Sequence, residues 1–390
     1  MKILFASDFS VSAFENLPTK EEMHCMLNGV KSRFEETDFS IVNLECVLYE
    51  GDSQPIVKSG PNIKGNPEFV EMLNYLNIDV AGLANNHAGD FGDEALINTM
   101  NLLEKNGIAY IGAGKSIKEA YLPYIFEKDD LKVAVIAACE NEFGVATETT
   151  MGSAGFNLLR LANAIKSASE ESDKVIVYFH GGNERNPFPS PEKTQLYRLL
   201  IDLGADGLIA MHTHSPQGYE IYNGKPIVYS MGNFFFPKKC EDDTYKTNPW
   251  YFGYLTELNI TNENIELEII PYRSTPLGMM EGTQLILGEE KQSFMHYLEE
   301  LTEPISSPEK LQYYFNIWCS IEGVMYAQNL NYSKEMESNN TSLCRHLKNA
   351  LSCEAHNELI KNTLNLCYFD ELDKYKNLQS KLQKYQHVNL

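Results

Sequence analysis

The chain has 390 residues, 43% of them hydrophobic and 22% charged, a composition typical of a globular protein with a large buried core. Its 54 acidic residues outnumber 32 basic ones, which gives a net charge of -22. Because nucleic acids and anionic membranes are recognised through clustered Lys and Arg side chains, this balance argues against both as the main partner. The charge leaves the catalytic chemistry open.

The first residues predict a strand and no export signal. The segment "KILFAS" (2–7) is a short apolar run that leads into Asp8, without the longer apolar region and cleavage site of a signal peptide. No stretch approaches the ~18 apolar residues needed to cross a bilayer. The eight cysteines show no Cys-x-x-Cys spacing. We therefore expect free thiols and a cytoplasmic location.

The first half of the chain alternates apolar strands with amphipathic helices. A helix is predicted to start at Asn66, its N-cap, with Pro67 at the first helical position. A second helix is expected at about 93–106, ended by Gly107. Strands are predicted at 2–7, 39–44, 79–84, 108–111, 123–127 and 132–138.

The second half continues the alternation and then changes character. A strand at 174–179 runs into His180, a helix begins at its N-cap Ser190, and a strand at 206–210 leads to His212. Strands in antiparallel order are expected at 225–230, 250–260 and 265–272. Alternating strands and helices followed by such strands indicate a layered α/β domain over residues 1–275.

Residues 276–390 are predicted to be mostly helical. The aromatic-rich segment "LQYYFNIWCSIEGVMY" is too apolar to be left exposed. We expect this region to pack on the α/β domain near its functional site or to form a subunit contact of a homo-oligomer. Burial of its apolar residues within an independent helical bundle is the alternative.

Polar residues with metal-binding side chains recur at the ends of the predicted strands. In α/β sheets the loops that bind ligands converge at that edge. Carboxylates, imidazoles and an amide oxygen are suitable ligands for a divalent cation, and two imidazoles on an irregular turn can converge on one point. Any one of these residues could be structural, but their shared placement predicts a metal centre. The set consists of Asp8, Glu45, Asn86, His87, His180, His212 and His214.

The other five histidines have no such placement. They follow no predicted strand, and we expect them to be ordinary surface or core residues. They are His24, His296, His346, His356 and His387.

Six sequence blocks occur in the order and spacing of a known family. Besides "SD" after the first strand they are "NLE", "LANNHAGDFG", "HGGNERNPFPSPEKTQ", "GADGLIAMHTH" and "GKPIVYSMGNFFF". They resemble the CapA/PgsA family of capsule and poly-γ-glutamate biosynthesis proteins, whose domain is similar to calcineurin-type metallophosphoesterases. The resemblance covers about residues 1–275. It implies a four-layer α/β/β/α sandwich with a metal centre at one edge of two sheets, here followed by the helical region.

The resemblance also implies two divalent cations of Mn, Zn or Fe. Asp8 and His214 would hold the first cation, and Glu45 would bridge both. The second cation would be completed by Asn86, His180 and His212. His87, next to a ligand, would be a catalytic acid that binds no metal. Ser10 stands where ordinary phosphoesterases carry a ligand histidine, so the first cation is expected to be held less firmly.

Several neighbouring residues are candidates for substrate contacts. Glu184 and Arg185 follow His180 within a proline-rich loop. Arg185 could clamp a substrate carboxylate or phosphate, or could pair with a surface acid. Glu184 is a second candidate for acid–base catalysis. Lys58 and Asn233 are expected to line the site. Asp90 is expected to orient His87 or to cap the next helix.

Three functions are compatible with these residues. The first is a metal-dependent hydrolase or transferase in capsule or poly-γ-glutamate metabolism, acting on a small or peptide-like anionic substrate, with metal-activated water and His87 as the acid. The second is a metal-dependent acid–base enzyme such as a peptide epimerase. The third is a non-catalytic biosynthesis or assembly factor. The complete ligand set of the second cation argues against the third function, which only Ser10 favours.

Overall fold

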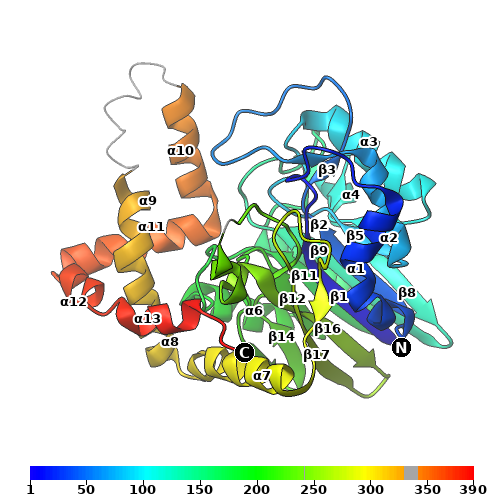
Figure 1. Cartoon of the computed structure of the whole chain (residues 1–390). Coiled ribbons are helices and arrows are strands. Elements are labelled where there is room, and N and C mark those ends of the chain that lie inside the picture. The colour runs from blue at the N-terminus through cyan, green and yellow to red at the C-terminus, as the bar shows by residue number, and fades with distance from the viewer. Residues whose placement is uncertain (241, 329–340) are drawn as a thin grey trace.

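Two β-sheets packed against each other form the centre of the computed structural model, which describes residues 1–240, 242–328 and 341–390 (Figure 1). The first sheet has the order β18 (Gln284–Leu285), β17 (Ile265–Arg273), β16 (Phe252–Ile260), β1 (Lys2–Phe9), β2 (Phe39–Leu44), β5 (Val80–Gly82) and β6 (Ala109–Ile111), and β15 (Asn233–Phe235) also pairs with β1. The second has the order β13 (Tyr219–Tyr222), β14 (Lys225–Val228), β12 (Gly207–Met211), β11 (Lys174–His180), β9 (Leu131–Cys139) and β8 (Tyr124–Lys128).

The inner faces of the two sheets share one hydrophobic core. Tyr178 of β11 lies between them: its hydroxyl donates to the Ala6 carbonyl at 2.5 Å, and its ring lies 5.8 Å from that of Phe5. Gly82 of β5 makes room for this ring, because a Cβ at that position would lie 2.8 Å from it. The tyrosine therefore fixes the spacing of the sheets close to the ends of their strands.

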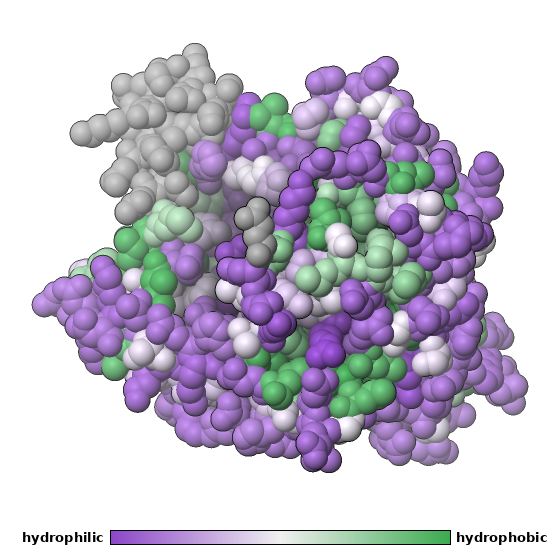
Figure 2. Space-filling view, in the orientation of Figure 1, coloured by the Kyte–Doolittle hydropathy of each residue, from purple (hydrophilic) through white to green (hydrophobic). Residues whose placement is uncertain are grey.

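Helices cover both outer faces. Buried residues of α1 (Lys20–Glu35), α2 (Val70–Tyr75) and α3 (Gly92–Lys105) form a cluster with β1 and β2. On the second sheet, Leu161 and Ile165 of α5 (Leu158–Glu171) and Leu200 of α6 (Pro191–Asp202) are fully buried in the core. The layers are thus α/β/β/α, and the predicted fold class is confirmed. Hydrophilic side chains dominate the face shown in Figure 2, where apolar residues form separate patches.

Local sequence signals place the helix ends near the site. The Ser190 side chain accepts from the Lys193 N–H, with Pro191 opening α6. Asn66 caps a 3₁₀ turn, η1 (Pro67–Phe69), which continues into α2. Gly107 follows α3 with φ of 74°, a left-handed conformation that glycine adopts without strain. These ends agree with the predicted ones within a few residues.

The strand order after β12 differs from the prediction. Strand β14 runs parallel to β12 and antiparallel only to β13, whereas β16 and β17 form an antiparallel pair in the other sheet. The expected antiparallel series is therefore wrong, because the chain crosses between sheets after β14. Helices α1 and α5 were not predicted. Shorter elements are α4 (Ile117–Ala120), η2 (Asp243–Lys246), η3 (Pro249–Tyr251) and the paired strands β3 (Val47–Leu48) with β4 (Lys64–Gly65) and β7 (Ala113–Gly114) with β10 (Gly152–Ser153).

The chain after β18 is helical. Figure 1 shows α9 to α13 gathered at one side of the sandwich. Phe315 and Trp318 are buried in the same hydrophobic cluster as the sheets. Among the described helices, none is long and apolar enough to cross a membrane. All eight cysteines are free. The elements are α7 (Gly288–Thr302), η4 (Glu303–Ser306), α8 (Pro308–Trp318), the π-helical turn η5 (Cys319–Gly323), α9 (Val324–Gln328), α10 (Thr341–Ser352), α11 (Glu354–Tyr368), α12 (Leu372–Lys376), α13 (Ser380–Gln383) and η7 (Lys384–Gln386).

Candidate metal centre

The predicted ligands meet where the ends of the two sheets face each other. The first sheet supplies the oxygen ligands at the ends of β1, β2 and β5: Asp8, Glu45 and Asn86. The second sheet supplies the imidazoles at the ends of β11 and β12: His180, His212 and His214. All are buried except Asn86, which is half-buried. The carboxylates and the imidazoles therefore approach one another from opposite sheets.

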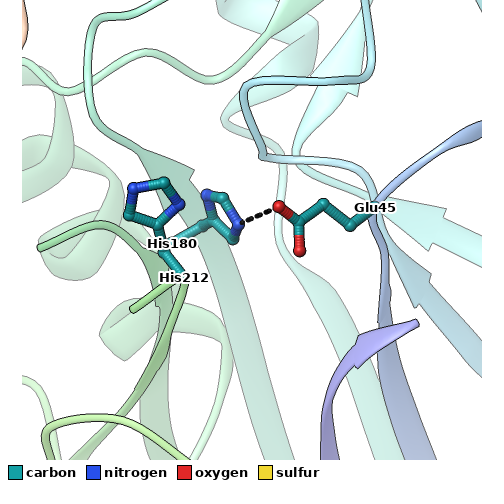
Figure 3. A group of neighbouring side chains, drawn as sticks. All are labelled: Glu45, His180 and His212. Carbon is teal, nitrogen blue, oxygen red and sulfur yellow. Dashed lines mark ion pairs between the residues drawn. The ribbon is translucent and has the colours of Figure 1, made fainter. Parts of the chain in front are cut away.

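Glu45 is common to two groups of ligand atoms. The first group contains Glu45, His180 and His212, and the second contains Asp8, Glu45 and His214; within each group the ligand atoms lie within 4.8 Å of one another. Figure 3 shows the Glu45 carboxylate reaching from the first sheet towards His180, with Oε1 3.3 Å from Nε2. The same Oε1 lies 3.9 Å from His214 Nε2. Glu45 thus has the position of a bridging ligand.

The His-x-His segment is an irregular turn. His212 has φ of 102° and His214 has φ of 55°. Such left-handed backbone is uncommon for residues other than glycine and concentrates at functional sites. The His212 N–H donates to Asp8 Oδ2 at 3.1 Å, which ties the turn to the first sheet. This backbone directs both imidazoles towards the carboxylates.

Five buried ligand atoms have no hydrogen-bond partner among the described residues: both carboxylate oxygens of Glu45, Oδ1 of Asn86, Nε2 of His180 and Nδ1 of His212. Unpaired buried polar atoms are costly and rare. A divalent cation coordinated by these atoms would satisfy them, so the residues present fit a bound metal ion.

The histidines have the protonation state that ligands require. Burial lowers the pKa of His180 to about 3, that of His212 to about 4 and that of His214 to about 3. The imidazoles are therefore neutral at pH 7, with a lone pair available. Burial and the neighbouring Glu45 charge raise the pKa of Asp8. Burial followed by the Glu184 charge raises the pKa of Glu45. A cation would offset this repulsion.

Asparagines that the sequence analysis did not single out orient Asp8. Asn43 Nδ2 donates to Asp8 Oδ1 at 2.8 Å, and Asn85 Nδ2 donates to Asn43 Oδ1 at 3.1 Å. Both residues lie beside predicted ligands, in "NLE" and "NNH", where strand-end placement could have identified them. The Ser10 hydroxyl contacts that of Ser12 at 3.0 Å.

His87 is held by a carboxylate. Its Nδ1 lies 2.7 Å from Asp90 Oδ2 and 3.1 Å from Lys58 Nζ, and Lys58 also forms an ion pair with Asp90. Asp90 therefore orients His87, one of the two roles expected for it. With Nδ1 engaged, Nε2 is the nitrogen free to exchange a proton.

A cavity of about 240 Å³ opens beside this centre. The sequence analysis set His346 and His356 aside, but both line this cavity, because the helical region brings α10 and α11 to the site. His346 is exposed and His356 is half-buried, so their placement beside the cavity adds to the expectation that they are surface or core residues and leaves it untested. The cavity residues include Lys58, Asn86, His87, Glu142, Phe143, Glu184, Tyr326, His346 and His356.

Glu142 links the metal centre to the helical region. Its Oε2 accepts from Asn86 Nδ2 at 2.5 Å, and Asn86 Oδ1 has no hydrogen-bond partner among the described residues. Its Oε1 lies 3.6 Å from His356 Nε2. Together with Cys353 these two residues form a third group whose ligand atoms lie within 4.8 Å of one another. Glu142 was missed, although it follows strand β9 and the strand-end rule could have found it.

The remaining predicted residues lie on either side of the centre. Glu184 and Arg185 are exposed; Arg185 has φ of 61°, and its N–H donates to the Thr213 carbonyl at 2.7 Å. Glu184 lines the 240 Å³ cavity, whereas Arg185 lines another, beside His214. Asn233 Oδ1 lies 2.8 Å from Nδ1 of His214 and so orients that imidazole.

Helix α11 is fastened to the loops that carry the site. The Glu354 carboxylate accepts from the backbone N–H and the side chain of Asn141 at 2.9 and 2.7 Å. Glu358 accepts from the Ser190 hydroxyl and from the Glu192 N–H at 3.0 Å. The helical region therefore packs on the α/β domain beside the centre, one of the arrangements expected from its sequence.

The two facing sheets thus bring carboxylates, an amide and imidazoles together at one edge of the sandwich. The chain belongs to the family described as bacterial capsule synthesis protein PGA_cap, whose model matches residues 7–238. The resemblance inferred from the sequence blocks is confirmed.

Two relatives with similar sequences are capsule or PGA biosynthesis proteins by name. The PGA biosynthesis protein CapA of Bacillus subtilis is 27% identical over 237 residues, covering 60% of this chain and 62% of that protein. The capsule biosynthesis protein CapA of Bacillus anthracis is 27% identical over 215 residues, covering 53% and 52%. The chain therefore spans between about half and two thirds of the length of these relatives.

Two solved structures that align with part of the chain are a phosphatase from Mycoplasma pneumoniae and a 5'-nucleotidase precursor from Thermus thermophilus. The first has a TM-score of 0.44 at 14% identity, covering 70% of this chain and 92% of that one. The second has a TM-score of 0.43 at 10% identity, covering 70% and 54%.

Proposed function

We propose that this protein is a metal-dependent hydrolase or transferase that acts on an anionic, peptide-like or small substrate of capsule or poly-γ-glutamate metabolism. The observation that carries the proposal is the set of five buried ligand atoms without partners, next to a histidine held by a carboxylate. The names of the relatives support a role in capsule or poly-γ-glutamate metabolism. Because poly-γ-glutamate carries carboxylates, such a role favours an anionic substrate.

In this proposal the two groups that share Glu45 hold two divalent cations. Asp8, Glu45 and His214 form one group, and Glu45, His180 and His212 form the other, completed by Asn86. Bound cations would acidify a water molecule and neutralise the charge that builds on an attacked phosphoryl or acyl group. The neutral imidazoles and the oriented Asn86 amide keep their lone pairs directed into the centre.

His87 is the proposed general acid. Asp90 accepts from Nδ1 and holds the imidazole in one orientation, so the proton for the leaving group is carried on Nε2. His87 lines the 240 Å³ cavity together with Lys58 and Glu184. A leaving group in that cavity would face His87, and Glu184 is the alternative proton carrier.

The residues around Asp8 suggest a second candidate. With Ser10 in place of a histidine, Asp8, Glu45 and His214 would offer three ligands to one cation, whereas Glu45, His180 and His212 together with Asn86 would offer four to the other. In this second candidate the centre would promote acid–base chemistry at a carbon next to a carbonyl, as in a peptide epimerase.

Metal analysis combined with a substrate panel tests these functions. We expect the purified protein to contain a divalent metal and to cleave a phosphoester or a γ-glutamyl peptide, whereas the His180→Ala variant loses both properties. Stereochemical inversion of a peptide without cleavage would assign the epimerase. Absence of both metal and turnover in the unaltered chain would leave the non-catalytic role and refute the proposal.

A further inference from the structure

A second cavity, of about 340 Å³, lies on the other side of the metal centre, beside His214. Its wall combines three basic side chains with aromatic rings. Residues from η3 and from the end of the helical region contribute to it. The lining residues include Arg185, His214, Lys238, Lys239, Trp250 and Tyr385.

The charge of this cavity is opposite to that of the whole chain. Arg185, Lys238 and Lys239 line it, and none of its described lining residues is acidic, although the net charge of the chain is -22. Lys239 is exposed and pairs with Glu15 at 2.7 Å. Within residues 1–240, 242–328 and 341–390, neither Arg185 nor Lys238 has an acidic partner within 4.0 Å. Arg185 and Lys238, two positively charged side chains without an acidic partner among these residues, therefore face the same space.

The charged group of Lys238 contacts an aromatic ring and no acidic side chain among the described residues. Its Nζ lies 3.1 Å from the centroid of the Trp250 ring. Burial, together with the Arg185 charge, lowers the pKa of Lys238 to about 8. The positive charges of Lys238 and Arg185 thus repel each other, and a bound anion would relieve that repulsion.

The cavity adjoins the metal centre through Trp250. The indole packs on the imidazole of His214 with ring centroids 4.7 Å apart, and the Trp250 carbonyl accepts from Asn233 Nδ2 at 3.1 Å. Asn233 in turn contacts His214 Nδ1. Trp250 in the wall therefore contacts both a predicted metal ligand, His214, and the asparagine that orients it. A molecule bound in the cavity would extend directly to the centre.

We propose that this cavity is an anion subsite, in which Arg185 and Lys238 bind a carboxylate or phosphate group of a substrate whose reacting bond lies at the metal centre. That the bound molecule is the substrate rests on the proposed function; the binding of an anion does not. The planar guanidinium suits two parallel hydrogen bonds to such a group, and the Trp250 and Tyr385 rings offer flat apolar surface to the chain that carries it. Carboxylate and phosphate share this chemistry, and the experiment separates them.

Trp250 provides the readout. It is one of only two tryptophans, the other being Trp318. A Trp318→Phe variant leaves Trp250 as the sole indole, and its fluorescence responds when an anion draws Lys238 away from the ring. The metal-stripped protein is titrated with inorganic phosphate and, separately, with γ-glutamylglutamate. If Trp318→Phe does not fold, the same titrations use the unaltered chain.

We expect a saturable fluorescence change with at least one probe. Lys238→Met should weaken the affinity about tenfold or more, the usual effect of losing a hydrogen bond to a charged group. Lys246→Met is the matched control, because Lys246 is an exposed lysine that pairs with Asp243 at 3.0 Å and does not line the cavity. Its affinity should equal that of the unaltered chain.

The outcomes separate the subsite from the catalytic proposal. Binding of phosphate alone assigns a phosphate group, and binding of the dipeptide alone assigns a carboxylate. Absence of a saturable change with either probe, or equal affinities in Lys238→Met and Lys246→Met, overturns the subsite. Binding that depends on Lys238 in a protein without metal or turnover would refute the proposed function and leave the subsite intact.

Discussion

His180 and His87 lie at the same edge of the sheets in different surroundings. Nε2 of His180 is buried without a hydrogen-bond partner, whereas Nδ1 of His87 is held by Asp90 at 2.7 Å. An imidazole with a free buried nitrogen is suited to ligation, and one held by a carboxylate is suited to proton transfer. Strand-end placement predicted both residues. It could not assign their roles, which depend on Asp90 and on the opposite sheet.

These surroundings predict that the two histidines fail differently when replaced. His180→Ala should lose metal and activity together. His87→Asn should retain the metal, while turnover falls by about 10²–10⁴, the usual contribution of a positioned general acid. Metal content by elemental analysis and turnover on the same samples provide the comparison. Loss of metal in His87→Asn would make His87 a ligand; full activity with full metal content would move the acid to Glu184.

Asp90 is a positioning residue, so its replacement should affect the proton-transfer step. We expect Asp90→Asn to reduce turnover most for substrates with poor leaving groups, because a neutral amide supports the doubly protonated ring of His87, which donates from Nε2, less than a carboxylate beside Nδ1 does. Metal content should stay unchanged. The check is the dependence of turnover on leaving-group acidity: an equal loss for all substrates would contradict this role.

At the level of elements, helix α11 is the part of the site that sequence reasoning did not place. The strands and capped helices of the α/β domain follow from local signals, such as Ser190 before α6 and Gly107 after α3. Helix α1 was missed although its sequence carries the signals of a helix, a capping box at Thr19 and buried residues at helical spacing from Met23 to Phe34. The contact of His356 with Glu142 joins residues more than two hundred positions apart, and no periodicity reports such a pairing.

The docking of α11 should depend on pH through Glu358. This carboxyl is 2% exposed, and burial raises its pKa from 4.5 to about 7. The folded state therefore holds a proton that the unfolded state releases above about pH 4.5. The free energy of unfolding therefore falls as the pH rises from about 4.5 to about 7. Above pH 7 the whole contribution of the neutral Glu358 carboxyl is lost. The change amounts to at most about 3 kcal/mol.

Replacing Glu358 with glutamine tests this linkage. The amide stays neutral and can retain its contacts with Ser190 and the Glu192 N–H, so Glu358→Gln should be more stable than the unaltered chain at pH 8 and similar at pH 5. Thermal unfolding at the two pH values measures the difference. The matched control is Glu192→Gln, since Glu192 is exposed and pairs with Lys361 at 3.2 Å. An identical pH dependence in Glu358→Gln and the unaltered chain would contradict the prediction.

In the whole molecule, the helical region and the sandwich share one core. Phe294, Leu298 and Phe315 are buried in the same cluster as the inner strands. The sequence predicted a four-layer domain followed by helices. The sheet also extends past the expected boundary at 275, because β18 pairs with β17. Amphipathic spacing reveals that a helix has an apolar face, but not which surface covers that face.

Removal of residues 288–390 should therefore destabilise the sandwich. A cut after 287 keeps β18 and exposes apolar surface that α7 and α8 normally bury. We expect the truncated chain to aggregate or to melt at a much lower temperature, measured by circular dichroism and gel filtration. A soluble monomer with unchanged melting temperature and metal content would show that the helices form an independent unit.

The division of the ligands between the sheets has a mechanical consequence. Asp8 and Glu45 belong to one sheet, and His180, His212 and His214 to the other, so a coordinated ion cross-links segments that are far apart in the sequence. Unlike a disulfide, such an ion would bind only where the strand ends already meet, so its binding would stabilise the folded edge and hold the strand ends together. A chelator would then loosen the edges of both sheets at once. Amide hydrogen exchange should rise at the ends of β2 and β11 together, although these strands share no backbone hydrogen bond.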